Sequence, residues 1–225
     1  MGIILAKLPD SLKSAKVLDN GNVMLPAMRM QYPSLFVPVA PSRREKDPKK
    51  VQWSVTGLIP GVCDLSALDD EIKSLINDNL TAAKQQPLRD GTLPYNQPLK
   101  DTASQQRLSD LADDYPKLIR MNAKKFTSNG QERPAPEVID AKGRPVEEAD
   151  APDMVYPGRW FRATIRPFWY DAQEGKPGVS CGLVNVQLLY NDDVLSGGKP
   201  KASSEFEALP DIDDGEDEPE EETYE

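Results

Sequence analysis

The 225-residue sequence contains no histidine and has two cysteines, Cys63 and Cys181. Without histidine, Ser-His-Asp and Cys-His catalysis, HExxH zinc sites and the usual general base near neutral pH are excluded. The cysteines lie 118 positions apart and form no CxxC pair. That spacing argues against a disulfide scaffold or structural zinc and suits a reducing cytoplasm. The sequence therefore predicts a protein that is not an enzyme and that holds no cofactor or metal.

Long apolar segments are missing as well. No apolar run approaches about 18 residues, so we expect no membrane span. The first seven residues lack a basic n-region, and their apolar stretch is too short for a signal peptide. Neither a GxxxxGKS/T phosphate loop nor a GxGxxG motif occurs. The acids Asp64, Asp69, Asp70 and Glu71 cluster at a predicted helix start. At that position acids are expected to cap the helix and to interact with its dipole, rather than to bind a metal.

Charge divides the chain into two parts. The formal net charge is −10, yet residues 205–225 hold twelve acids and no Lys or Arg, so residues 1–204 carry 25 acids against 27 bases. Like charges repel and cannot bury apolar area, so we expect residues 203–225 to be a disordered acidic tail. The tail either solubilises the protein or interacts, with partner proteins or with a basic groove of its own chain. An aromatic residue near the end favours interaction, through Asp217, Glu218, Glu220, Glu221, Glu222 and Tyr224.

Alternation of apolar and polar residues predicts five strands. They are expected at 23–31, 51–59, 118–126, 159–171 and 179–190. Pro26 implies that the first strand lies at an edge or contains a bulge. Residues 1–22 are interpreted as a loosely attached extension that the Asn20-Gly21 turn closes.

One helix is predicted after the second strand. Ser66 with Asp69 resembles a capping box, and apolar residues follow at helical spacing: Leu68, Ile72, Leu75, Ile76 and Leu80. Residues 87–116 are polar and proline-rich, with at best a short helix near 105–112. Five strands, one packed helix and long loops predict a mainly β fold, an OB-like five-stranded barrel, with an antiparallel sandwich as the competing fold. The predicted parts are an extension at 1–22, the OB domain at 23–202 and the tail at 203–225.

The strand predicted at 159–171 has two different faces, because side chains alternate across a strand. One face is apolar and is expected to be core: Phe161, Ala163, Ile165, Pro167 and Trp169. The other interleaves arginines with aromatics: Trp160, Arg162, Thr164, Arg166, Phe168 and Tyr170. The segment 118–126 repeats this pattern, with Ile119, Met121 and Ala123 on one side and Arg120, Asn122, Lys124 and Phe126 on the other.

Cations spaced with flat rings are what a single-stranded nucleic acid needs. Lysine and arginine meet phosphates, and each exposed base stacks on a ring for about 1–3 kcal/mol. A solvated basic sheet is the alternative interpretation, and Trp53 lies among apolar residues that suit a core equally well. The candidate DNA contacts are Trp53, Lys100, Arg120, Lys124, Phe126, Trp160, Arg162, Arg166, Phe168 and Tyr170.

An ordered set of segments resembles a family of phage single-stranded DNA-binding proteins. Residues 156–163 and 178–187 resemble its signature. Three upstream segments occur in the order that the family has, namely Tyr32–Phe36, Pro98–Asp101 and Met121–Lys124, so the resemblance covers roughly residues 24–195. It implies an OB-fold, sequence-tolerant binding of single strands, and a role in phage replication or recombination in the cytoplasm of the bacterial host. The segments 1–22 and 102–116 match nothing in this pattern.

The resemblance also implies partners. The acidic tail with its near-terminal aromatic is similar to the tails of other replicative single-strand binders, which dock partner proteins. A homodimer is left open. Two other functions are weighed against DNA binding: a phage protein-interaction or DNA-mimic module that acts through the tail, and a carboxylate-metal nuclease.

Overall fold

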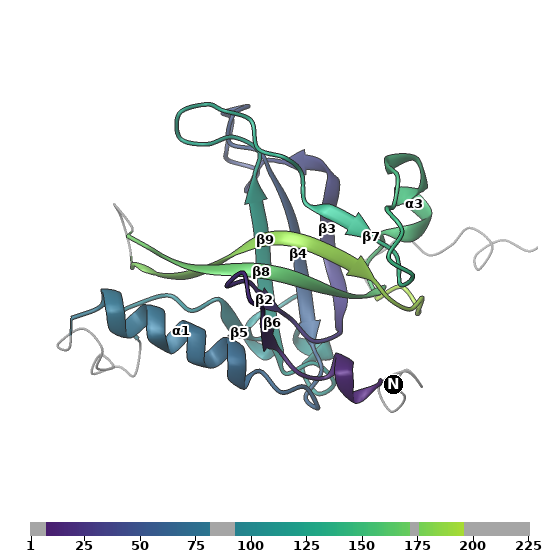
Figure 1. The fold of residues 1–225 in the computed structure, drawn as a ribbon, viewed down its shortest axis with the longest axis horizontal. Helices are drawn as coiled ribbons and strands as arrows, with labels where there is room; N and C mark the ends of the chain where they lie inside the picture. The colour runs from purple at the N-terminus through teal and green to yellow at the C-terminus, as the bar shows by residue number, and fades with distance from the viewer. Residues whose placement is uncertain (1–7, 82–92, 172–175, 196–225) are drawn as a thin grey trace, which may run out of the picture.

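The computed structural model describes residues 8–81, 93–171 and 176–195. Within these residues the protein is mainly β, with long loops, one nine-stranded sheet and two α-helices, α1 (Ser66–Asn79) and α3 (Ala151–Met154) (Figure 1). The strands are β1 (Lys16–Val17), β2 (Val23–Met24), β3 (Met28–Val39), β4 (Gln52–Ile59), β5 (Leu99–Asp101), β6 (Lys117–Lys124), β7 (Glu137–Ile139), β8 (Trp160–Tyr170) and β9 (Gly178–Leu188). Short 3-10 turns lie at Asp10–Leu12, Thr102–Ser104, Ser109–Leu111 and Glu148–Asp150. No helix among the described residues is long and apolar enough to cross a membrane.

All five predicted strands are present. The segment predicted at 23–31 divides into β2 and β3, because Pro26 lacks the N–H that a continuous ladder requires. The other four correspond to β4, β6, β8 and β9. Residues 105–112 contain a 3-10 turn rather than an α-helix. The acidic tail at 203–225 lies outside the described residues.

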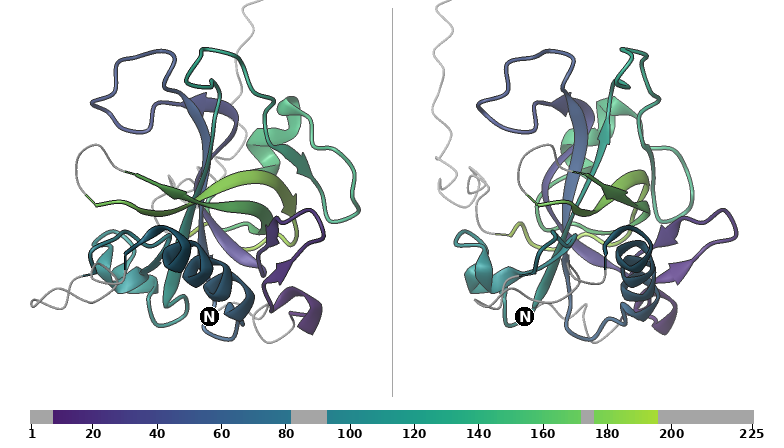
Figure 2. Two further views of the ribbon diagram at one scale, coloured as in Figure 1. Left: turned by 60° about the vertical axis from the view of Figure 1, so that its left-hand side comes forward. Right: turned by 90° about the vertical axis from the view of Figure 1, so that its left-hand side faces the viewer.

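Five of the strands pair in a cycle. β3 pairs with β4, β4 with β6, β9 with β8 and β8 with β3, all antiparallel. The remaining pair, β6 with β9, is parallel, and it brings Met121 beside Cys181. The order β3-β4-β6-β9-β8 thus returns to β3, and the two views of Figure 2 show the strands crossing around a common interior. One side of each strand therefore faces inward and the other faces outward.

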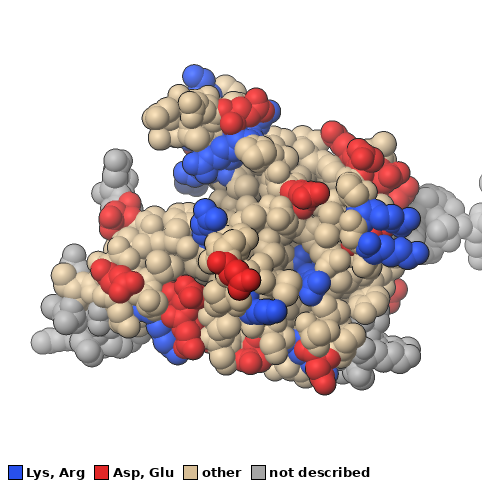
Figure 3. Space-filling model, in the orientation of Figure 1, with Lys and Arg blue, Asp and Glu red and all other residues tan. Residues whose placement is uncertain are grey.

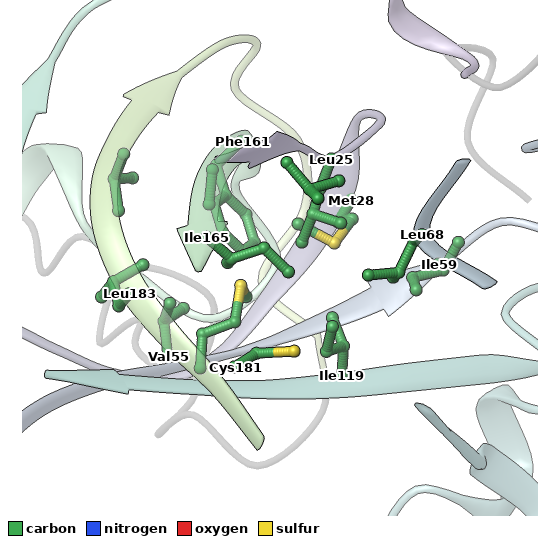
Figure 4. Close-up of a cluster of buried hydrophobic side chains, with 14 of the residues drawn as sticks. Leu25, Met28, Val55, Ile59, Leu68, Ile119, Phe161, Ile165, Cys181 and Leu183 are labelled. Atoms are coloured by element: carbon green, nitrogen blue, oxygen red, sulfur yellow. The ribbon is translucent and has the colours of Figure 1, made fainter. Parts of the chain in front are cut away.

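Apolar side chains fill the interior. Phe161 and Ile165 are fully buried and Ala163 nearly so, as the alternation of β8 predicts. Figure 4 shows Phe161 and Ile165 together with labelled residues of β3, β4, β6, β9 and α1 in this cluster. Pro167 and Trp169, predicted to join this face, are only partly buried. The inward face of β8 is thus core along its first half.

Helix α1 closes one end of this core through the residues that its periodicity predicted. Leu68, Ile72, Ile76 and Leu80 are all buried. The predicted Ser66–Asp69 capping box is wrong: the carboxylate of Asp64 instead accepts hydrogen bonds from the Ser66 backbone N–H at 2.9 Å and from its hydroxyl. These bonds lower the pKa of Asp64. The reason is that Ser66 is already the first helical residue, so the capping group comes from two residues earlier.

The N-terminal segment is packed rather than loosely attached, over the part that the structure describes. Leu8 is 3% exposed, and the backbone N–H of Ala15 donates to the carbonyl of Asp64 at 2.8 Å. The predicted Asn20-Gly21 turn is confirmed, since Gly21 has φ of 76° between β1 and β2. β2 pairs with β8, so the hairpin β1–β2 extends the sheet beyond the cycle of five strands.

Candidate nucleic-acid interface

The outward side of β4, β6, β9 and β8 forms one curved polar surface. Residues opposite each other in a ladder point the same way. The register therefore places Asn122 of β6, Gly182 of β9 and Arg166 of β8 in one row across three strands. Lys124 lies further along the same side of β6, opposite Gln52 of β4. We call this surface the outer face.

A first cavity, of about 630 Å³, lies where two loops project from the sheet. One loop, 40–51, joins β3 to β4, and the other follows β6; both rise at the top of Figure 1. The cavity is lined by Pro41, Asp47, Lys49, Lys50, Val51, Gln52, Lys124, Phe126, Thr127, Ser128, Asn129 and Gly130. The Nζ of Lys125 lies 5.5 Å from the ring centroid of Phe126, so a cation already covers part of this ring. We call this cavity the loop cleft.

A second cavity, of about 670 Å³, adjoins it on the outer face. Its lining is Asn122, Ala123, Lys124, Arg133, Pro134, Ala135, Pro136, Arg166, Phe168, Gly182, Leu183, Val184 and Asn185. Phe168 is 43% exposed, and its Cε1 lies 3.8 Å from where a Cβ on Gly182 would stand. The exposed ring therefore lies close to Gly182 on the neighbouring strand β9. Lys124 lines both cavities, so they adjoin on the outer face, and we call the two together the path.

Positive charge gathers along this path. Figure 3 shows Lys and Arg side chains around the projecting loops at the top of the view. The loop 40–51 carries five exposed bases: Arg43, Arg44, Lys46, Lys49 and Lys50. An ion pair with Glu45 at 3.2 Å compensates Lys50. Sequence reasoning did not assign Lys49, Lys50 or Arg133 to the site; the density of bases between two predicted strands was the signal that could have found the lysines.

The prediction that Trp160 is an exposed stacking residue is wrong. Its ring is fully buried, and its Nε1–H donates to Oδ2 of Asp192 at 2.8 Å. The same oxygen accepts from Nη1 of Arg29 at 2.6 Å, and the guanidinium of Arg29 lies 5.4 Å from the Trp160 ring centroid. The reason is coverage: the segments around Tyr115 and 191–195 fold over this end of the outer face. Trp160 packs there in a second apolar cluster with Leu8, Ala27, Leu58, Leu108, Tyr115 and Leu118.

Trp53 also belongs to the core rather than to the surface. It is 5% exposed, and its Nε1–H donates to the backbone carbonyl of Phe36 at 3.3 Å. Its partner across the ladder is Ala123, on the inward side of β6. The prediction of Trp53 as a DNA contact is therefore wrong, and the alternative core interpretation is confirmed.

The remaining predicted contacts lie at different places on the surface. Arg162 is half-buried, and its Nε donates to Oε1 of Gln187 at 2.8 Å. The guanidinium of Arg120 is exposed and contacts Gln105 at 3.3 Å. The hydroxyl of Tyr170 accepts from Asn96 at 3.0 Å. Lys100 is exposed on β5 opposite Leu118, at the covered end of the face.

The structure thus brings Lys124, Phe126, Arg166 and Phe168 onto one path and leaves the other predicted contacts beside or beneath it. The sheet is closed, and its open outer surface carries both basic side chains and aromatic rings. These features are typical of the class of β-proteins that bind single-stranded nucleic acid. Residues 21–220 match the family described as Enterobacter phage Enc34, ssDNA-binding protein. The chain belongs to this family.

Solved structures give the same fold. The single-stranded DNA-binding protein of bacteriophage Enc34, in a C-terminal truncation, is 17% identical, with a TM-score of 0.61 over 83% of this chain and 95% of that chain. The Enc34 protein in complex with ssDNA is 17% identical, with a TM-score of 0.55 over 84% and 97%. Bacteriophage T7 gp2.5, a single-stranded DNA-binding protein, is 15% identical, with a TM-score of 0.53 over 79% and 96%. A comparison with curated protein sequences gave no match.

Proposed function

We propose that this protein binds single-stranded DNA without sequence preference and without catalysis, in phage replication or recombination in the host cytoplasm. The observation that carries the proposal is the pair of adjoining cavities on the outer face, both lined by Lys124. A groove that combines cations with stackable rings suits a single strand, because phosphates and bases are exposed together. Family membership and the structure of a relative with ssDNA support this function.

The site residues have two roles in this proposal. Phe168, with its open ring, and Phe126, in the loop cleft, stack bases. Lys49, Lys50, Lys124, Arg133 and Arg166 meet phosphates. Arg120 and Arg162, on the same outward side of their strands, contact the strand where it leaves the path.

The ring of β3, β4, β6, β9 and β8 is proposed to be an OB barrel. Support comes from the strand count and from the closing pairs, including the parallel β6–β9 pair. OB-folds bind oligonucleotides on the face of their second and third strands and with the loops between strands 1–2 and 4–5. Of these elements, β4, β6 and the loop 40–51 line the loop cleft.

The direct test is titration of a fluorescently labelled oligothymidine, followed by anisotropy at several salt concentrations. We expect binding whose affinity falls steeply with salt, and weaker binding of duplex DNA of the same length. No binding at low salt would overturn the proposal and would favour the interaction module that acts through the acidic tail. Magnesium-dependent cleavage of the oligonucleotide would show a nuclease instead.

The acidic tail is proposed to dock replication or recombination proteins, or to compete with DNA for the outer face. Removing 205–225 changes the formal charge from −10 to +2. A tethered polyanion competes at high effective concentration, so the truncated protein should bind oligothymidine more tightly at low salt, and the difference should shrink as salt rises. Equal affinities at low salt would exclude competition. Tyr224→Ala then separates docking from solubilisation, since only docking predicts weaker capture of a replication protein.

A further inference from the structure

We infer that the N-terminal hairpin β1–β2 forms one wall of the DNA-binding face, that Asn22 is a positioning residue for Arg166, and that Lys16 adds a phosphate contact. The inference rests on the proposed function, and its ligand is the phosphodiester backbone of the same strand. The carrying contact joins Nε of Arg166 to Oδ1 of Asn22 at 3.2 Å. Asn22 is 5% exposed, whereas the guanidinium of Arg166 is on the surface.

The hairpin holds Asn22 in place through its own turn. Its backbone N–H donates to Oδ1 of Asn20 at 3.0 Å, and its carbonyl accepts from the N–H of Leu18 at 2.8 Å. The ladder with β8 pairs Val23 with Ile165, so Asn22 stands beside Arg166 by register. The backbone of Asn22 therefore forms the hydrogen bonds of the turn, and its side chain accepts the hydrogen bond from Arg166.

A neutral partner suits an arginine that has to bind phosphate. The amide of Asn22 orients the guanidinium through Nε and leaves its charge uncompensated. None of the ion pairs among the described residues involves Arg166. The terminal N–H groups keep their planar fork for a phosphate. Because the side chain is oriented before DNA arrives, less conformational entropy is lost on binding.

Lys16 extends the same surface by one strand. It pairs with Met24 of β2, which in turn pairs with Thr164 of β8. Opposite residues point the same way, so Lys16 shares the outward side with Thr164 and Arg166. Lys16 is exposed. A strand that follows the outer face past Arg166 meets this lysine next.

A double-mutant cycle on the full-length protein tests the positioning role. The variants are Asn22→Leu, Arg166→Gln and both together, and the readouts are oligothymidine affinity, its salt dependence and the melting temperature. Asn22→Leu removes the acceptor at nearly constant volume and should weaken binding about two- to fivefold. In the Arg166→Gln background it should add nothing. A loss of equal size in both backgrounds would show a merely structural role and overturn the positioning of Arg166.

Lys16→Gln tests the phosphate contact proposed for the hairpin. Lys13→Gln is the matched control, because Lys13 lies in the same segment and forms an ion pair with Asp10 at 2.9 Å. Lys16→Gln should reduce the slope of log affinity against log salt by about 0.7, and Lys13→Gln should leave it unchanged. Equal slopes for Lys16→Gln and the parent would overturn the contact. If Arg166→Gln weakens binding but both hairpin variants bind normally, the inference fails and the proposed function stands. If Arg166→Gln is also silent, the proposed face itself is wrong.

Discussion

At each of the two ends of β8 an arginine lies near an aromatic ring, but the two pairs differ in burial, and the arginine at the first end comes from β3. At the first end, Trp160 and the neighbouring Arg29 are buried, with a carboxylate of Asp192 against both. At the second end, Arg166 and Phe168 are exposed and line a cavity. Both ends pair an arginine with an aromatic ring on the outward side of the sheet. One pair holds the fold together, and the other is free to meet a ligand.

The difference comes from what covers the sheet. The segment that ends at Tyr115, together with residues 191–195, lies over the first end and adds a second apolar cluster on the outward side of the sheet. Burying an arginine is costly unless its charge is paired, and Asp192 supplies the pair at 2.6 Å. The second end has no such cover among the described residues, so its charges remain available. Coverage, and not strand face, separates structural from functional residues here.

The sharpest way to break this comparison is to replace one ring at each end. Trp160→Ala removes a fully buried ring and should lower the free energy of unfolding by about 3–5 kcal/mol. Phe168→Ala should change stability by less than about 0.5 kcal/mol, since its ring is already exposed. Urea denaturation followed by circular dichroism measures both. Similar losses for the two variants would mean that the ends are not different in kind.

The cover can be tested without touching a ring. Asp192→Ala leaves the Arg29 guanidinium buried without its carboxylate and should cost about 3–5 kcal/mol of stability. Asp193→Ala is the matched control, because Arg29 contacts only the backbone carbonyl of that residue. The control should unfold at nearly the parent denaturant concentration. If both variants behave alike, the ion pair does not fasten the segment 191–195.

Much of the fold could be predicted from the sequence, because its long elements repeat their pattern. The helix follows from five apolar residues at helical spacing, and β4, β6, β8 and β9 are each eight or more residues long, enough for stretches of alternation to register. The strands β1, β5 and β7 contain only two or three residues, too few for alternation to register. β5 and β7 form along the edges of the long strands β6 and β9, and β1 forms as the hairpin partner of the equally short β2.

The site was harder to predict than the fold. Alternation states which side of a strand a residue occupies, but not whether a distant segment covers it. Alternation therefore predicts the correct side of β8 for Trp160 but the wrong role, because the ring is buried. Lys49 and Phe126 meet in one cleft because two loops project together, and sequence spacing carries no information on that convergence.

The open end should show its largest effect in binding. Phe168→Ala should weaken oligothymidine binding by about 1–3 kcal/mol, because a base loses its stacking partner. Phe168→Trp retains a ring and should bind close to the parent level. Anisotropy titrations at one fixed salt concentration provide the comparison. Equal weakening by both substitutions would point to the shape of the cavity, not to stacking.

Charges on the path should change the salt dependence of binding. Lys124→Gln and Lys49→Gln should each reduce the slope of log affinity against log salt by about 0.7, the value for one lost phosphate contact on a single strand. Lys73→Gln is the control, because Lys73 is on α1 and lines neither cavity. A slope that changes for the control as much as for Lys124 would show that net charge, and not the path, governs affinity.

The smallest effect concerns Asp140, in the turn after β7 that supports Arg162 through Gln187. Its carboxylate accepts from the backbone N–H of Arg144 at 2.9 Å and from the Nε of the same residue at 2.7 Å, and its own carbonyl accepts from Gln187 at 3.2 Å. The Arg144 N–H, then its guanidinium, lower the pKa of Asp140 from its ordinary value of 3.8. A carboxyl whose pKa is lower in the folded than in the unfolded state contributes stability above the unfolded value. That contribution disappears as the pH falls through the folded pKa.

Between pH 6 and pH 3 the parent protein should therefore lose slightly more melting temperature than Asp140→Asn, which has no such carboxylate to protonate. Asp153→Asn, an exposed carboxylate of α3, is the matched control and should follow the parent. Thermal melts at four or five pH values measure the difference. Because residues 140–144 line neither cavity, oligothymidine affinity at neutral pH should stay within about twofold of the parent. An equal fall of melting temperature with pH for the parent and Asp140→Asn would show that this ion pair forms only weakly in solution. A large loss of oligothymidine affinity would show that the turn belongs to the binding path.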